Sequence, residues 1–195
     1  MEAGGAIVAI LSAIMGYLVY DTYYQNEVEY IISNVDKNTY LVRSLPDKQE
    51  AADLIARIRG RLETFVGHMN ESFQDDERVQ RLVKNFQPDK ISEGSENAKY
   101  TSYSINKGEK IVLCLRSRDE QKKLVDLNTM MFVALHEMAH LATESIGHTP
   151  EFWKNFKWLL GEAVKINIYT SQDFNNKPVE YCGVKITDNP LNREF

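Results

Sequence analysis

The sequence predicts an α+β fold, in which a small antiparallel hairpin packs on helices, with a transmembrane helix at the N-terminus. Segments with a helical period of apolar residues lie before and after one short pair of strands, an order typical of the α+β class. The first segment of the chain is apolar and free of charge. At 195 residues the chain suits one domain with its own core. We expect an anchor over residues 1–24 and one domain over residues 25–195.

The anchor is predicted from residues 3–20, which are almost wholly apolar and uncharged. A helix of this length, at ~1.5 Å per residue, reaches about 27 Å, close to the ~30 Å hydrocarbon core of a bilayer. Tyrosines gather where an aromatic belt would lie, at Tyr17, Tyr20, Tyr23 and Tyr24. The segment predicts a single-pass membrane protein. Its sidedness stays open, because no Lys or Arg precedes Lys37.

Two further properties of this segment bear on its role. A cleaved signal peptide normally begins with a basic region, whereas only the acidic Glu2 precedes the apolar run, and no small-residue cleavage site follows. Gly5, Ala9 and Ala13 recur every four residues, a stripe on which two helices can pack closely. A homodimer through the anchor is therefore one option.

Charge and cysteine content restrict the partners. The net charge is −5, with 28 acidic and 23 basic residues. Broad nucleic-acid binding needs a clustered basic face, so no nucleic-acid partner is expected. The two cysteines, Cys114 and Cys182, form no CxxC pair, which argues against a thiolate zinc site. One disulfide or none remains open.

The first half of the domain is predicted to contain a strand, two helices and a loop. Residues 39–47 alternate in polarity and end at Pro46, as a short strand does. Residues 48–69 keep a helical period of apolar side chains. A second short helix covers 75–86, and the turn formers of 87–99 indicate a loop.

The second half begins with a hairpin over 100–118, in which residues 106–109 (NKGE) form the turn and 111–115 the buried second strand. Helices are expected over about 127–145 and 150–166. The tail from residue 175 is predicted to be loop with one short strand at most.

Two histidines of the first of these helices indicate a metal site. In HEMAH, His136 and His140 are four residues apart, so both rings leave one helix face about 40° apart. Two imidazole nitrogens at this spacing can approach one Zn²⁺. Glu137, about 100° from His136, can reach a metal-bound water without ligating the metal. The helix is otherwise uncharged around the motif, and buried polar groups need partners.

His148 is the predicted third ligand. In a continuous helix it would lie ~12 Å beyond His140, out of reach. Gly147 is suited to end the helix, Thr149 to cap the next one, and Pro150 to begin it, so His148 falls in a corner that can turn back over the metal. Two alternatives for the third ligand are Glu144 and Glu162. The fourth histidine, His68, is most simply a surface residue.

The segments VALHEMAHL (133–141) and GHTPEFW (147–153) carry a family resemblance. Over about residues 111–160 the chain resembles the zincin metallopeptidases, in particular the small SprT-like and WLM-type peptidases. The resemblance implies a zincin-like domain, a metal-binding core over about 111–166 and zinc as cofactor. Relatives that act on DNA–protein crosslinks usually add basic or zinc-finger tails, and neither occurs in this sequence. A similarity to anchored proteins of large DNA viruses implies a viral or host membrane as the location.

The implied activity is zinc-dependent hydrolysis of a polypeptide substrate by an endopeptidase. Glu137 would act as general base on a zinc-activated water. By resemblance, the strand over 111–117 borders the cleft and pairs with an extended substrate. Tyr181 or Tyr169 could assist the oxyanion. The alternative is a catalytically inactive, zinc-stabilised binding or scaffold module on a membrane.

Overall fold

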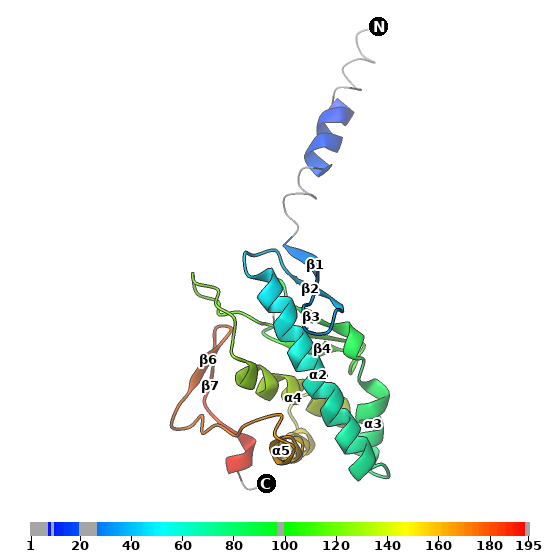
Figure 1. Cartoon of the computed structure of the whole chain (residues 1–195), viewed down its shortest axis with the longest axis vertical. Helices are drawn as coiled ribbons and strands as arrows, with labels where there is room; N and C mark the ends of the chain where they lie inside the picture. Colours follow the sequence, from blue (N-terminus) through cyan, green and yellow to red (C-terminus); the bar gives the residue numbers. More distant parts are fainter. Residues whose placement is uncertain (1–7, 9, 20–26, 97–99, 194–195) are drawn as a thin grey trace.

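The structure is a computed structural model that describes residues 8, 10–19, 27–96 and 100–193. It confirms the α+β class (Figure 1). In chain order the named elements are β1 (Val28–Ile32), β2 (Thr39–Arg43), α2 (Lys48–Ser72), α3 (Glu77–Asn85), β3 (Ile91–Glu93), β4 (Tyr103–Ile105), β5 (Lys110–Leu113), α4 (Leu127–Ala142), α5 (Pro150–Lys165), β6 (Val179–Tyr181) and β7 (Val184–Ile186).

The predicted membrane anchor over residues 1–24, and the membrane localisation drawn from it, are wrong. None of the helices in the described part of the chain combines the length and apolar character that a bilayer crossing requires. Residues 1–7, 9 and 20–24 lie outside the described residues, and with them Gly5 and Ala9 of the proposed dimer stripe.

Helix α2 is the longest element and supplies one side of the core. Its apolar residues recur at helical spacing, so one face is buried while the opposite face meets solvent. It packs against α4, α3 and the strands β1 to β3. The buried side chains include Leu54, Ile55, Ile58, Leu62, Phe65 and Met69. The predicted helix over 48–69 is confirmed, with three more residues at its end.

The central sheet has the strand order β3-β5-β4. β5 pairs with β3 in parallel and with β4 in antiparallel orientation, so both of its edges are occupied. β4 is an edge strand. The predicted substrate-pairing role of residues 111–117 is therefore wrong for 111–113, because these residues lie in a central strand whose backbone groups are already paired.

The turn between β4 and β5 forms at the predicted residues. Asn106 and Lys107 have φ angles of 45° and 53°, and Gly108 follows with φ 115°. The Gly108 amide donates to the Ile105 carbonyl at 3.0 Å. A Cβ at position 108 would lie 2.3 Å from the Asn85 carbonyl oxygen, so only glycine fits between this turn and α3.

Two hairpins complete the fold. β1 pairs with β2, and the C-terminal tail forms the antiparallel pair β6–β7, where one short strand at most was expected. A disulfide between Cys114 and Cys182 ties the β6–β7 turn to the end of β5, with Cα atoms 6.3 Å apart across a separation of 68 residues. This bond resolves the pairing that the sequence left open.

Candidate metal centre

Helix α4 presents the HEMAH motif from the centre of the core. The Asp126 carboxylate caps its first turn by accepting hydrogen bonds from the amides of Asn128 and Thr129, both at 3.0 Å. At the other end, the Thr143 hydroxyl donates to the Ala139 carbonyl at 2.7 Å. The helix ends at Ala142, three residues earlier than predicted. His136, Glu137 and His140 lie in its second half, and the two histidine rings contact Phe152 of α5.

The corner between α4 and α5 is fixed by side-chain hydrogen bonds. Thr149 is the N-cap of α5, and its hydroxyl oxygen accepts from the Phe152 amide at 3.3 Å. The Glu151 carboxylate accepts from the amides of Glu144 and Ser145, each at 3.2 Å. Gly147 has φ 83°, a conformation that favours glycine. This arrangement turns the chain so that His148 lies over α4.

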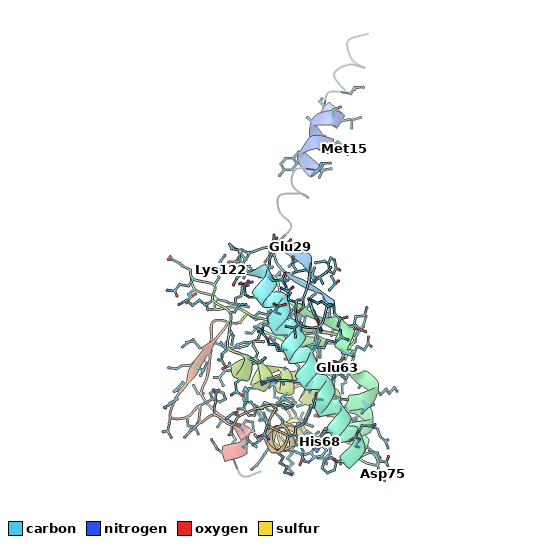
Figure 2. The ribbon with its side chains drawn as sticks, in the orientation of Figure 1. Met15, Glu29, Glu63, His68, Asp75 and Lys122 are labelled. Atoms are coloured by element: carbon cyan, nitrogen blue, oxygen red, sulfur yellow. A yellow bond between two sulfur atoms is a disulfide. The ribbon has the colours of Figure 1, made fainter. Side chains whose placement is uncertain are left out.

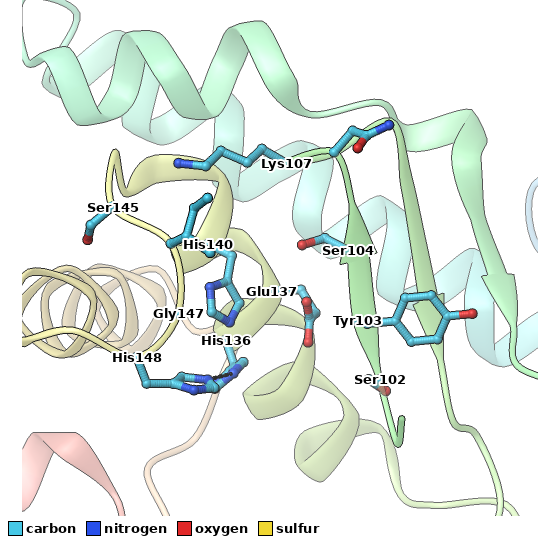
Figure 3. A pocket seen from close by; sticks show the side chains of 12 residues that line it. Ser102, Tyr103, Ser104, Lys107, His136, Glu137, His140, Ser145, Gly147 and His148 are labelled. Atoms are coloured by element: carbon cyan, nitrogen blue, oxygen red, sulfur yellow. Dashed lines mark hydrogen bonds between the residues drawn. The ribbon is translucent and has the colours of Figure 1, made fainter. Parts of the chain in front are cut away.

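The three predicted histidines lie together (Figure 3). Nitrogen atoms of His136, His140 and His148 all lie within 4.8 Å of one another. The Nε2 atoms of His136 and His148 are 2.9 Å apart. Each pair of rings has a centroid separation of 4.9 or 5.0 Å. One metal ion could be held by these three side chains.

Aromatic side chains of α5 pack around the histidines. The Phe152 ring lies within 5 Å, centroid to centroid, of all three imidazoles. Phe156 contacts His136 at 5.2 Å, and Trp153 contacts His148 at 5.7 Å. This apolar surrounding disfavours charge on the rings.

The imidazoles are consequently held neutral. Burial, reinforced by the neighbouring histidines, lowers the pKa of His136 to about 3. Burial, followed by the charges of His148 and Lys107, lowers the pKa of His140 to about 4. Burial also lowers the pKa of His148. Metal ions bind the neutral imidazole, so this environment suits ligation.

Glu137 is the buried carboxylate of the site, with 3% of its surface exposed. Burial raises its pKa to about 7, although hydrogen bonds from the Ser104 side chain and backbone act in the opposite direction. Its Oε2 atom is buried and has no hydrogen-bond partner among the described residues. An unpartnered carboxylate oxygen beside three neutral imidazoles leaves one strong acceptor for a ligand or water.

A cavity of about 460 Å³ joins these groups. α4 and the following corner form one wall, and β4 with its turn forms the other (Figure 3). The lining residues are Ser102, Tyr103, Ser104, Asn106, Lys107, His136, Glu137, His140, Ser145, Ile146, Gly147 and His148. The site is thus a cleft between the motif helix and the edge strand.

Other residues considered from the sequence lie elsewhere. The Glu162 carboxylate lies 3.5 Å from His68 Nε2 and accepts from Lys165 at 2.6 Å, so it faces α2 rather than the cleft. Glu144 is exposed and does not line the cavity. His68, near the end of α2 (Figure 2), is half-buried against Glu162 and Phe73 instead of free on the surface.

Neither tyrosine proposed for the oxyanion lines the cavity. The Tyr181 hydroxyl donates to the Cys114 carbonyl at 2.9 Å and lies 2.6 Å from the Ser102 hydroxyl. The Tyr169 hydroxyl accepts from Asn189 at 3.2 Å. Burial raises the pKa of both phenols. Both tyrosines are core residues.

Sequence reasoning missed Ser104 and Lys107 as cleft residues. Ser104 belongs to β4 and hydrogen-bonds Glu137. Lys107 is in the β4–β5 turn, and its ammonium donates to the Thr143 carbonyl at 2.8 Å and to the Glu144 carbonyl. Both contacts cross between distant segments. The NKGE sequence predicted that Lys107 lies in a hairpin turn. It did not predict which part of the chain that turn contacts.

The fold and the histidine cluster are those of a metallopeptidase-type domain. Comparison with known protein families identifies the particular family. Residues 34–194 match the WLM domain, so the chain belongs to the WLM family. The resemblance over about 111–160 that the motifs carried is therefore correct at family level and extends over most of the chain.

The relatives include viral proteins. The chain is 32% identical to the uncharacterized protein R325 of Acanthamoeba polyphaga mimivirus over 196 residues, covering 94% of this chain and 95% of that protein. Over 81 residues it is 36% identical to the uncharacterized protein 136R of Invertebrate iridescent virus 6, covering 41% and 42% of the two chains.

A solved structure shares the fold. The crystal structure of Wss1 from Saccharomyces cerevisiae superposes with a TM-score of 0.50 and 22% sequence identity. The match covers 65% of this chain and 86% of the Wss1 chain. At this identity the likeness shows the fold alone.

Proposed function

We propose that this protein is a zinc-dependent endopeptidase in which His136, His140 and His148 hold the ion and Glu137 is the general base. One observation carries the proposal. The unpartnered Oε2 of Glu137 shares a cavity with three imidazoles whose nitrogens lie within 4.8 Å of one another. Membership of the WLM family supports a hydrolase of the metallopeptidase type.

The residues present fit a zinc ion. Neutral imidazole is a preferred zinc ligand, and burial keeps all three rings neutral. Three protein ligands leave a fourth position open, which is the arrangement of catalytic rather than structural zinc sites. When bound in such a site, zinc supplies Lewis acidity toward a carbonyl oxygen and lowers the pKa of water to ~7.

Glu137 provides the proton transfer. Its carboxylate accepts a proton from the attacking water and gives that proton to the leaving amine nitrogen. Ser104 hydrogen-bonds the carboxylate and so orients it, leaving Oε2 as the atom that accepts. The Phe152 ring and its neighbours exclude water from the far side of the imidazoles.

The substrate is proposed to be a polypeptide bound in extended form along β4. This strand forms the cleft wall opposite α4, and its outer edge is free of strand partners in the described sheet. Backbone amides and carbonyls on a free edge can pair with an added strand. A peptide bound in this way passes directly in front of Glu137 and the histidines.

Glu137→Gln tests the proposal. The variant keeps the size and the Ser104 hydrogen bond but cannot accept the proton, so the zinc-loaded protein should keep its metal and lose hydrolysis of casein and of a mixed peptide library. Glu144→Gln, at an exposed position outside the cavity, is the matched control and should cleave as the wild type does. Full activity in Glu137→Gln would remove Glu137 as the base.

The same assay distinguishes an active peptidase from a catalytically inactive binding module. A wild-type protein that binds one zinc ion per chain but cleaves no peptide, with or without chelator, would favour the binding module. Elemental analysis of the purified full-length protein gives the zinc content independently of activity.

A further inference from the structure

The two ends of the cleft differ in charge. Along the β4 wall the lining runs from Ser102 to the turn residues Asn106 and Lys107. At the turn end, the Lys107 side chain extends from the hairpin tip toward α4, above His140 (Figure 3). Its ammonium donates to the carbonyls of Thr143, at 2.8 Å, and Glu144. Lys107 therefore crosses the cleft at this end.

Lys107 also gives the cleft its positive charge. Among the described residues that line the cavity, it is the one Lys or Arg. A lysine ammonium has three N–H donors, and the two carbonyls take two of them. One donor remains, together with a full charge, at the turn end of the cavity. Hydrogen bonds from a charged donor to a carboxylate are stronger than those between neutral groups.

A peptide paired with β4 would approach this charge. The strand ends at Ile105 and leads directly into the turn that carries Lys107. Residues of a bound peptide on this side of the reacting bond therefore lie beneath the ammonium group. One carboxylate would accept the free N–H of the ammonium group and balance its single positive charge, so that neither charge is left without a partner.

We propose that Lys107 forms a carboxylate-recognition subsite, which selects peptides carrying a carboxylate at a fixed distance from the reacting bond. The carboxylate can come from an Asp or Glu side chain or from the C-terminus of the peptide. This inference rests on the proposed function, and it names a substrate class for that site.

Binding to the zinc-loaded Glu137→Gln protein tests the subsite without hydrolysis. The probes are peptides that differ by Glu or Gln at one position at a time, each with a free or an amidated C-terminus. Trp153, whose ring lies 5.7 Å from that of His148, reports binding by its fluorescence. At one position, or at the C-terminus, replacing the carboxylate by the amide should weaken binding about tenfold, or ~1.4 kcal/mol.

Variants of Lys107 assign the effect. Lys107→Gln keeps a donor for the Thr143 carbonyl but removes the charge, so the preference for the carboxylate should vanish. Lys107→Arg should preserve it. Lys110→Met is the matched control, because this lysine is on β5 and does not line the cavity. Equal binding of every Glu and Gln pair, or a preference that persists in Lys107→Gln, overturns the proposal.

The two proposals can fail separately. Peptides that bind with the Lys107-dependent preference but are not cleaved by the zinc-loaded wild type would overturn the peptidase and keep the subsite. Cleavage at sites without any acidic or C-terminal preference would overturn the subsite and keep the peptidase. Product mapping by mass spectrometry distinguishes a side-chain carboxylate from a terminal one.

Discussion

The ring of Phe152 is stacked on the imidazole of His140, with centroids 4.3 Å apart and an interplanar angle of 29°. Phe152 is in the first turn of α5 and is fully buried, while His140 is near the end of α4. The contact therefore joins the two helices that carry the histidines. It also makes the packing of the core and the geometry of the cluster interdependent.

Phe152→Ala should destabilise the protein by about 3–5 kcal/mol, because a large buried ring is lost and a cavity remains. Zinc affinity should fall as well, since the ring contacts all three histidines. Chemical denaturation and competition with a chelator measure the two effects. Phe152→Leu, which retains most of the volume, is the control. Equal zinc affinity in the Ala variant and the wild type would show that the ring does not hold the histidines.

His148→Ala should lower zinc affinity by at least about 100-fold. Loss of a residue that only hydrogen-bonds a metal ligand already lowers affinity by ~10- to 100-fold, and loss of a ligand should cost more. The variant leaves two imidazoles on α4 and removes the one that the corner supplies. His68→Ala is the matched control, because this histidine faces Glu162 outside the cleft. Chelator competition gives both affinities. Unchanged affinity in His148→Ala would assign the third ligand to another residue.

Glu137 should make the metal-free protein less stable at high pH. Its pKa is about 7 in the folded state and 4.5 ordinarily, so between these values the folded state holds the proton more tightly than the unfolded state. Stability from this group is present below pH 4.5 and is lost as the pH rises through 7. The free energy of unfolding of Glu137→Gln should therefore be about 3 kcal/mol higher than that of the wild type at pH 8 and only slightly higher at pH 5.

Denaturant unfolding in the presence of chelator measures this difference at both pH values. Glu144→Gln, on an exposed side chain, should follow the wild type throughout. A gain in Glu137→Gln of the same size at pH 5 and pH 8 would mean that burial of the charge is not its cause.

Loss of the disulfide should destabilise the protein by about 2–4 kcal/mol, because a bond across 68 residues restricts the unfolded chain. Cys114→Ala with Cys182→Ala removes it, and reduction of the wild type should give the same loss. The β6–β7 hairpin should become sensitive to proteolysis first, since this bond ties it to β5. A double variant as stable as the oxidised wild type would contradict the prediction.

Much of the candidate site could be predicted from the sequence. Four-residue spacing places His136 and His140 on one helix face. The sequence GHTP encodes the corner through a threonine cap, a proline start and a glycine with positive φ, although α4 ends before Gly147, at Ala142. These signals involve residues that are close together in the sequence, so they can be recognised without knowledge of the tertiary structure. The turn at residues 106–109 could be predicted for the same reason, because the positive φ angles of a turn depend on the residue types within it.

Tertiary structure alone decided the rest. That β4 rather than β5 lies on the sheet edge depends on β3, which pairs with β5 from some twenty residues away. The burial of Tyr181 and Tyr169, the contact of Lys107 with α4, and the Cys114–Cys182 bond likewise join distant segments. The apolar composition of residues 3–20 predicted a membrane localisation that is wrong, because no helix among the described residues is long and apolar enough to cross a bilayer. Local propensity specifies helices, caps and turns, whereas strand order and side-chain partners follow from long-range packing, which no short window of sequence contains.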